Sequence, residues 1–230
     1  MIRPNGVHHL AIATANMKEQ LSFFNEVLGM ELVALYWMHG VDGAWHGFMK
    51  ASDECYIAFV GMDSIGKIPI EIGKTHAGNG ALPCAPGTMQ HVALNVDTES
   101  ELITLRDRIR SRGVNVFGPL NHGFCKSIYF AGPEQLTLEI ATSEEAIDGN
   151  LWIDPEVVAL VGISAEELGA LRSPQHFAGD GGRIPQPPMD PSKPRSYQSP
   201  ERYAQMLKMT DEEFGALSIP DPPVKAKTAA

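Results

Sequence analysis

The sequence has few cysteines, few basic residues and no long apolar run, and each shortage excludes a class of protein. Its three cysteines show no Cys-x-x-Cys spacing, so neither a disulfide framework nor a zinc–thiolate cluster is expected. The 18 basic residues are outnumbered by 28 acidic ones, and a net charge of −10 argues against nucleic-acid and anionic-membrane partners. No apolar run approaches the roughly 20 residues of a membrane span. The opening segment lacks the apolar stretch of a signal peptide, so we expect a cytoplasmic protein.

The chain changes character near residue 145. Residues 1–145 alternate short apolar runs with two amphipathic segments, and 43% of the chain is hydrophobic, which is enough for a packed core. Residues 146–230 are interrupted by Pro- and Gly-rich coil and by helix-start signals, namely capping boxes at Ser164 and Thr210 and a Ser199–Pro200 pair. We therefore expect an α+β domain over residues 1–145, followed by a C-terminal extension of short helices that covers the domain or a second subunit.

The expected domain repeats one pattern. The run HHLAIATANMKEQLSFFNEVLGMELV begins at His8, and QHVALNVDTESELITLRDRIRSRGVNV begins at Gln90. Each is a short strand, an amphipathic helix, a glycine where a helix C-cap is expected (Gly29, Gly113) and an extended run. The later strands are expected at Leu32–Trp37, Trp45–Lys50, Tyr56–Val60, Val114–Phe117, Ser127–Ala131 and Leu136–Thr142. Two βαβββ modules, over about residues 1–75 and 88–145, are therefore predicted to pair around a shared cleft.

Alternation along the expected strands gives each sheet a packing face and a cavity face. In residues 8–14 the larger apolar side chains alternate with His9 and two alanines, and the strand that includes His91 repeats this arrangement. We expect the apolar face to pack beneath the helix, so that His9 and His91 occupy equivalent positions and point into the cavity. The closing strand places Glu139 on the matching small and polar face, in the middle of an apolar run. Burying a carboxylate there is costly unless it has a partner.

Two imidazoles and one carboxylate at matching positions predict a metal site at the centre of the cleft. His9, His91 and Glu139 are ligands suited to Fe(II), Mn(II), Co(II), Zn(II) or Ni(II), and three protein ligands leave positions open for water and substrate. Each residue also has a purely structural interpretation, as a hydrogen-bonded histidine or a paired core carboxylate. The coincidence of all three on one face favours the metal. His8, beside a ligand, is expected to orient it.

Four stretches, HHLAIAT, FFNEVLGMELV, QHVALNV and HGFCKSIYFAGPEQLTLEIAT, resemble the vicinal oxygen chelate superfamily, also called the glyoxalase/bleomycin-resistance/dioxygenase family. The resemblance covers residues 1–145. It implies paired βαβββ modules and a divalent metal on which substrates bind through vicinal oxygens, with His9, His91 and Glu139 at the family's ligand positions.

One departure separates the chain from glyoxalase I-type members, which carry a fourth ligand on the first module's closing strand. Transferring the 48-residue spacing between His91 and Glu139 to the first module points to Ile57, and no residue from Tyr56 to Val60 binds metal well. Three ligands are instead the pattern of the family's extradiol-type dioxygenases, which favours Fe(II).

Family members that cleave hydroquinone rings resemble the chain further. They carry a tyrosine ten residues before the glutamate, which is Tyr129 here, and an arginine seven residues before that tyrosine, where this chain has His122. Tyr129 is expected to donate a hydrogen bond to bound substrate or oxygen, and His122 to act as an acid, base or donor. The structural alternatives are a core tyrosine and a loop histidine.

The leading hypothesis is thus a homodimeric, metal-dependent dioxygenase acting on a phenolic or similar substrate with vicinal oxygens, without an organic cofactor. The same three ligands would serve a non-oxidative glyoxalase-like lyase, isomerase or epimerase, in which the metal acts as a Lewis acid. A small-molecule-binding or resistance protein is the third hypothesis, and the intact set of His9, His91 and Glu139 argues against it. Iron content and O₂ uptake separate the first two hypotheses, and a metal-free protein that still binds aromatic ligands would favour the third.

Overall fold

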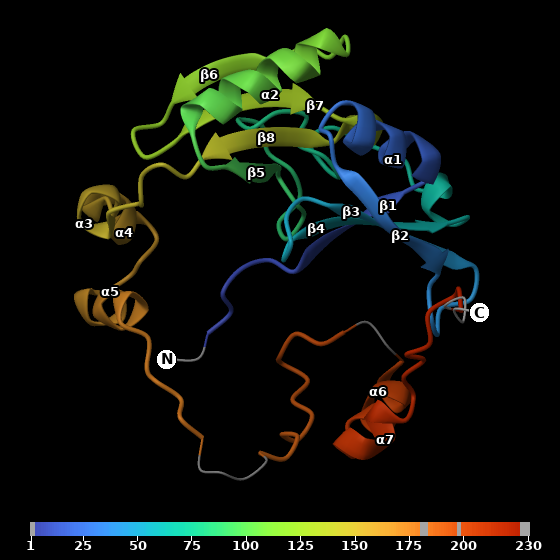
Figure 1. Ribbon diagram of the computed structural model, residues 1–230. Helices are drawn as coiled ribbons and strands as arrows, with labels where there is room; N and C mark the ends of the chain where they lie inside the picture. The colour runs from blue at the N-terminus through green and yellow to red at the C-terminus, as the bar shows by residue number, and fades with distance from the viewer. Residues whose placement is uncertain (1–2, 180–183, 197–198, 226–230) are drawn as a thin grey trace. The chain divides into compact units, whose positions relative to one another are not determined.

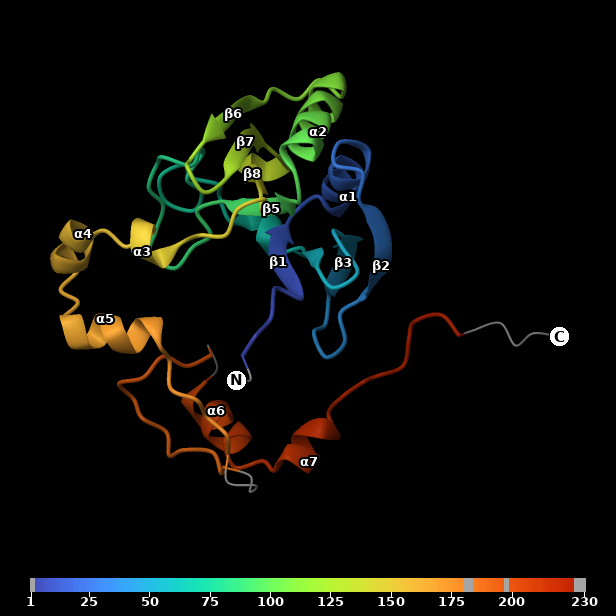
Figure 2. The same cartoon turned by 60° about the vertical axis from the view of Figure 1, so that its left-hand side comes forward.

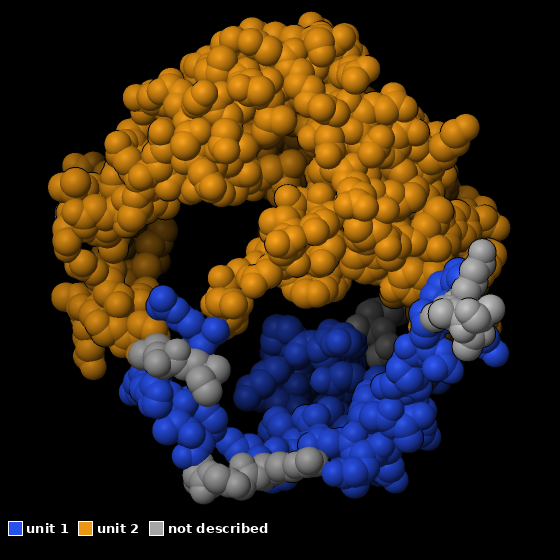
Figure 3. Space-filling view, in the orientation of Figure 1, with its two compact units in different colours: residues 1–3, 175–230 blue, residues 4–174 orange. Residues whose placement is uncertain are grey.

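The computed structural model describes residues 3–179, 184–196 and 199–225. The chain divides into two compact units, residues 4–174 and residues 175–230 with residues 1–3 (Figure 3). The first unit carries two four-stranded sheets with their helices, which confirms the α+β class (Figure 1). None of the described helices is long and apolar enough to cross a membrane.

The first module has the order β-α-β-β-β that the repeat predicts. Its elements are β1 (His9–Thr14), α1 (Met17–Glu26), β2 (Glu31–Trp37), β3 (Ala44–Lys50) and β4 (Tyr56–Met62), followed by a short 3₁₀ turn, η1 (Ile65–Lys67). The sheet has the order β1-β4-β3-β2, with β1 parallel to β4 and the other pairs antiparallel. The Asn16 side chain caps α1, and Gly29 follows the helix with a φ of 81°, as its C-cap position predicts.

The second module repeats this topology. Its elements are β5 (Val92–Val96), α2 (Glu99–Ser111), β6 (Phe117–Asn121), β7 (Lys126–Ala131), the 3₁₀ turn η2 (Pro133–Gln135) and β8 (Thr137–Thr142). The sheet order β5-β8-β7-β6 matches that of the first module. Thr98 and Glu101 form a capping box at the start of α2.

The strand predicted over Val114–Phe117 is wrong in its position, because β6 begins only at Phe117. The residues before Phe117 instead hydrogen-bond to the end of α2 and pack into the core. The N–H of Val114 donates to the carbonyl of Ile109, Val116 is buried, and its carbonyl accepts from Arg110. These contacts take the place of strand pairing.

One hydrophobic core spans both modules. Helices α1 and α2 each cover one face of a sheet (Figures 1 and 2). The fully buried side chains between helix and sheet include Phe24, Phe59, Leu102, Ile109, Ile128 and Leu138. On β1, Ile12 and Thr14 are buried whereas Ala11 and Ala13 are exposed, which confirms the expected alternation.

Glu134 joins the two modules. It lies in η2, between β7 and β8, with a φ of 53°. Its Oε2 accepts from Thr14 Oγ1 (2.6 Å) and Gln20 Nε2 (2.9 Å), and its Oε1 accepts from the backbone N–H of Ala15 (2.8 Å). Both side-chain donors are buried in the first module. This carboxylate therefore fixes the turn that leads into β8 against the first module.

The C-terminal part contains five short helices within the described residues. They are α3 (Gly149–Trp152), α4 (Pro155–Leu160) and α5 (Ala165–Arg172) in the first unit, and α6 (Pro200–Met206) and α7 (Asp211–Gly215) in the second. The capping boxes predicted at Ser164 and Thr210 are both formed, and Pro200 lies at the first position of α6 after its Ser199 cap.

Candidate functional site

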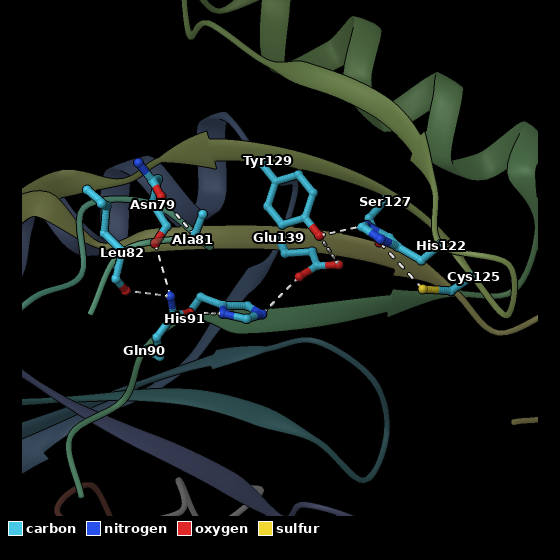
Figure 4. A network of polar contacts seen from close by, with 10 residues as sticks. All are labelled: Asn79, Ala81, Leu82, Gln90, His91, His122, Cys125, Ser127, Tyr129 and Glu139. Carbon is cyan, nitrogen blue, oxygen red and sulfur yellow. Dashed lines mark hydrogen bonds and ion pairs between the residues drawn. The ribbon is translucent and has the colours of Figure 1, made fainter. Parts of the chain in front are cut away.

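His91 and Glu139 meet on the open face of the second sheet. His91 directly precedes β5, and Glu139 lies at the middle of the neighbouring parallel strand β8, opposite Ala93. Nε2 of His91 is 3.0 Å from Oε2 of Glu139 (Figure 4). Only 6% of Glu139 is exposed, so its charge is largely removed from water. The structure thus pairs this buried carboxylate with His91, one of the two histidines expected to bind a metal ion with it.

Gln90 determines which nitrogen of His91 carries a proton. Nε2 of Gln90 donates to the carbonyls of Asn79 (3.0 Å) and Leu82 (3.1 Å), so its Oε1 faces Nδ1 of His91, with which it makes a short hydrogen bond (Figure 4). Because a carbonyl oxygen only accepts, Nδ1 carries the proton. In the neutral ring, Nε2 then presents its lone pair to Glu139.

A lone pair facing a carboxylate oxygen at 3.0 Å requires a positive charge between or on the two groups. A divalent cation meets this requirement, since metal–nitrogen and metal–oxygen bonds are about 2.0–2.2 Å long and two ligand atoms about 3 Å apart can share one ion. A proton on Nε2 would meet it as well, by making an imidazolium–carboxylate pair. The pair therefore fits a metal, and the Gln90 contact is of the kind that orients metal-binding histidines.

Tyr129 and His122 extend the cluster from the other carboxylate oxygen. Oη of Tyr129, on β7, donates to Oε1 of Glu139 at 3.0 Å, and Nε2 of His122 lies 3.0 Å from the same Oη (Figure 4). A hydroxyl has one proton, so His122 is the donor to Tyr129. Burial raises the pKa of Tyr129, and the hydrogen bond to Glu139 raises it further. Tyr129 is therefore held as a protonated donor.

His9 lies on the other sheet with different partners. It is exposed at the start of β1, with its Nδ1 2.9 Å from Nδ1 of His8, and its ring lies near His46 and Phe48. Among the described residues, no group of three or more His, Cys, Asp or Glu side chains is placed to hold one metal ion. The structure thus brings together His91 and Glu139 and leaves His9 apart from them.

Strand register corrects the comparison of the two modules. His9 pairs with Tyr56 and Ala11 with Ala58, whereas Ala93 pairs with Glu139. Ala58, one residue after the expected Ile57, therefore occupies the position of Glu139, because the connections within the two modules differ in length. An alanine offers no ligand there. By the same register Phe48, which pairs with Ala58, occupies the position of Tyr129.

Two residues near these histidines had no role in the sequence analysis. His46, on β3, is 7% exposed, and its Nε2 has no hydrogen-bond partner among the described residues. Burial lowers the pKa of His46, and the proximity of His9 lowers it further, so the ring is neutral. Alternation along β3 places it on one face with Phe48, which is the signal that would have found it. The role of Gln90 depends on loop carbonyls that no local pattern specifies.

Comparison with known proteins assigns the sheet domain. A family model described as the Glyoxalase/Bleomycin resistance protein/Dioxygenase superfamily matches residues 6–152. No curated protein matches the chain.

Similar solved structures include a glyoxylase/bleomycin resistance protein/dioxygenase domain from Frankia sp. EAN1pec, with 13% identity over 62% of this chain and 100% of that one and a TM-score of 0.48. The antibiotic-binding protein TnmS3 from Streptomyces sp. CB03234 shares 18% identity over 63% and 100% of the two chains, with a TM-score of 0.44. The fosfomycin resistance protein FosX from Listeria monocytogenes, in complex with Mn(II), shares 14% identity over 66% and 100%, with a TM-score of 0.43. The match to the family model covers more than half of the sequence, and this chain belongs to the glyoxalase/bleomycin resistance protein/dioxygenase superfamily.

Proposed function

We propose that the chain is a metal-dependent dioxygenase of the extradiol, ring-cleaving type, acting on a phenolic substrate with vicinal oxygens. The observation that carries the proposal is the 3.0 Å pairing of His91 Nε2 with the buried Glu139 Oε2. The contact with Gln90 puts the proton of the neutral His91 ring on Nδ1, which leaves Nε2 available to an ion. His91 and Glu139 would hold the ion. When bound, Fe(II) supplies Lewis acidity that lowers the pKa of a coordinated phenol, together with electrons for O₂.

His9 is the proposed third ligand. Since His9 lies apart from His91 and Glu139, and the two modules share one packed core, the proposal requires the second copy of the chain in a homodimer to supply its His9. Phe48 and Tyr36, whose rings lie 6.4 Å apart and nearly parallel on the same sheet, offer a flat apolar surface suited to an aromatic substrate.

Tyr129 would supply a hydrogen-bond donor to the substrate beside the Glu139 carboxylate. Its hydroxyl points at Oε1 of Glu139, and rotation about its C–O bond is enough to turn that proton toward a substrate oxygen. His122 keeps Oη in place by donating from Nε2. The raised pKa of Tyr129 suits a hydrogen-bond donor, because the phenol remains protonated at neutral pH.

The test is oxygen consumption by the full chain, purified anaerobically and loaded with Fe(II), on a panel of catechols and hydroquinones. Tyr129→Phe and His122→Gln are each expected to lower kcat by about 100-fold or more, the usual effect of losing a positioned acid or base. His76→Gln is the matched control. Within the described part of the chain, the His76 side chain hydrogen-bonds to Thr75 and to no member of the cluster formed by His91, Glu139, Tyr129 and His122.

Two outcomes would replace the proposal. Metal-dependent turnover without O₂ consumption would favour the non-oxidative lyase, isomerase or epimerase. Tight binding of aromatic compounds by a protein that takes up no metal would favour a binding or resistance protein.

A further inference from the structure

A cavity of about 720 Å³ lies beside the cluster formed by His91, Glu139, Tyr129 and His122, and Tyr129 is one of the residues that line it. Its walls come from the loop Gly78–Gly80, the segment Gly113–Phe117 that follows α2, and Arg110 in the last turn of α2. The volume is in the range of about 300–1,000 Å³ that is usual for small-molecule sites. A ligand in this cavity would therefore lie directly against the side chain that contacts Glu139.

Arg110 is the charged side chain of this cavity, and the other described residues that line it are uncharged. Arg110 is exposed, and its Nη2 donates to the carbonyl of Val116 at 3.0 Å, which holds the guanidinium at the cavity wall. That bond uses one of five N–H donors in a planar fork whose geometry matches a carboxylate. In a chain with a net charge of −10, a cation at the wall of an otherwise neutral cavity favours an anionic group.

The loop over residues 78–82 connects the cavity to His91 and Tyr129. A Cβ placed on Gly80 would lie 3.5 Å from Cε1 of Tyr129, so the loop backbone packs on the tyrosine ring. The carbonyls of Asn79 and Leu82 in the same loop hold the Gln90 amide that orients His91 (Figure 4). A ligand that contacts this loop would therefore contact the residues that position both His91 and Tyr129.

We propose that this cavity binds the non-reacting part of the substrate, an apolar side chain that ends in a carboxylate, with Arg110 as its counter-ion. The apolar stem contacts the rings of Phe117 and Tyr129 at the wall, and the carboxylate accepts from the guanidinium. The substrate class is then an aromatic carboxylate rather than a neutral phenol. The assignment of the substrate rests on the proposed function, whereas the presence of an anion-binding site at Arg110 does not depend on it.

The experiment is isothermal titration calorimetry of the full chain, without added metal, using phenylpropionate and its neutral analogue phenylpropanol as probes. Neither probe carries vicinal oxygens, so failure of the metal proposal would leave the result unchanged. Wild-type protein is expected to bind phenylpropionate about tenfold or more tightly than phenylpropanol, the usual effect of a hydrogen bond to a charged group. Equal affinities for the two probes would overturn the proposal.

Variants locate the site. Arg110→Gln is expected to abolish the preference for phenylpropionate, and Arg110→Lys, which keeps the charge, to retain part of it. Arg112→Gln is the matched control, because Arg112 follows α2 and does not line the cavity. Gly80→Leu, which adds bulk at the cavity wall beside the Tyr129 ring without changing charge, is expected to weaken the binding of both probes. Unchanged binding in Arg110→Gln, or in a folded Gly80→Leu protein, would place the ligand elsewhere and refute the proposal.

Discussion

Replacement of Glu134 by glutamine should destabilise the sheet domain, because this carboxylate is one of the polar contacts that hold the second module against the first. It accepts three hydrogen bonds, from Thr14, the backbone of Ala15 and Gln20, at 2.6–2.9 Å. The Thr14 and Gln20 side chains are buried, so water does not replace a lost partner. An amide in the same place keeps one acceptor oxygen but turns an NH₂ group toward the remaining donors.

The magnitude follows from these three bonds. Hydrogen bonds to a charged acceptor contribute about 1.5–3 kcal/mol and neutral ones about 1 kcal/mol. Losing one bond and weakening the others, discounted because Glu134 is only half-buried, gives about 2 kcal/mol in the free energy of unfolding. For a unit of this size that corresponds to a fall in Tm of about 4–8 °C. Urea unfolding followed by circular dichroism would measure it, with the exposed Glu166→Gln as control.

The effect should depend on pH in a defined direction. Burial by itself would raise the pKa of Glu134, but hydrogen bonds from Thr14, Gln20 and the backbone outweigh it and hold that pKa below the usual 4.5. A carboxylate whose pKa is lower in the folded state stabilises the fold above the unfolded pKa and loses that effect as the pH falls through the folded value. The difference in the free energy of unfolding between wild type and Glu134→Gln should therefore have its largest value at pH 7 and decrease below about pH 4.5. No difference at pH 7, or one that stays constant to pH 3, would refute this account of the module contact.

Three further predictions concern single side chains. Gln135→Gly should raise the free energy of unfolding by about 0.5–1 kcal/mol, since Gln135 is exposed with a φ of 61° that glycine adopts without strain; a loss of stability in urea would contradict this. Gln90→Leu should weaken divalent-metal binding about 10–100-fold in a chelator competition titration, because Nδ1 of His91 loses its acceptor; unchanged affinity would remove the orienting role. His46→Leu should leave the free energy of unfolding unchanged or increase it by about 1 kcal/mol, since it removes a buried nitrogen that has no hydrogen-bond partner among the described residues; a large loss would contradict this.

Features with a local cause were predictable from the sequence. The repeated module order and the glycine after α1 follow from hydrophobic periodicity and helix-cap chemistry, which act over a few residues. Alternation placed the alanines of β1 on the open face. It also placed Glu139 on the same face as His91, and the structure brings these two within contact distance.

Features that depend on distant segments were not predictable. The position of β6 is set by Val116 entering the core, and the equivalence of Ala58 to Glu139 by a one-residue difference in connection length. The contacts of Gln90 involve loop carbonyls, and those of Glu134 involve the other module. The separation of His9 from His91 likewise depends on how the two modules pack rather than on any strand pattern.

The central claim is that His91 and Glu139 hold a divalent metal ion, and the metal content of the full chain purified anaerobically tests it most directly. We predict about one equivalent of iron per chain in the wild type, lost in both His91→Gln and Glu139→Gln and retained in His76→Gln. A wild-type protein without metal, which also takes up none from Fe(II), Mn(II) or Zn(II) solutions, would contradict the account and identify the pair as an imidazolium–carboxylate contact.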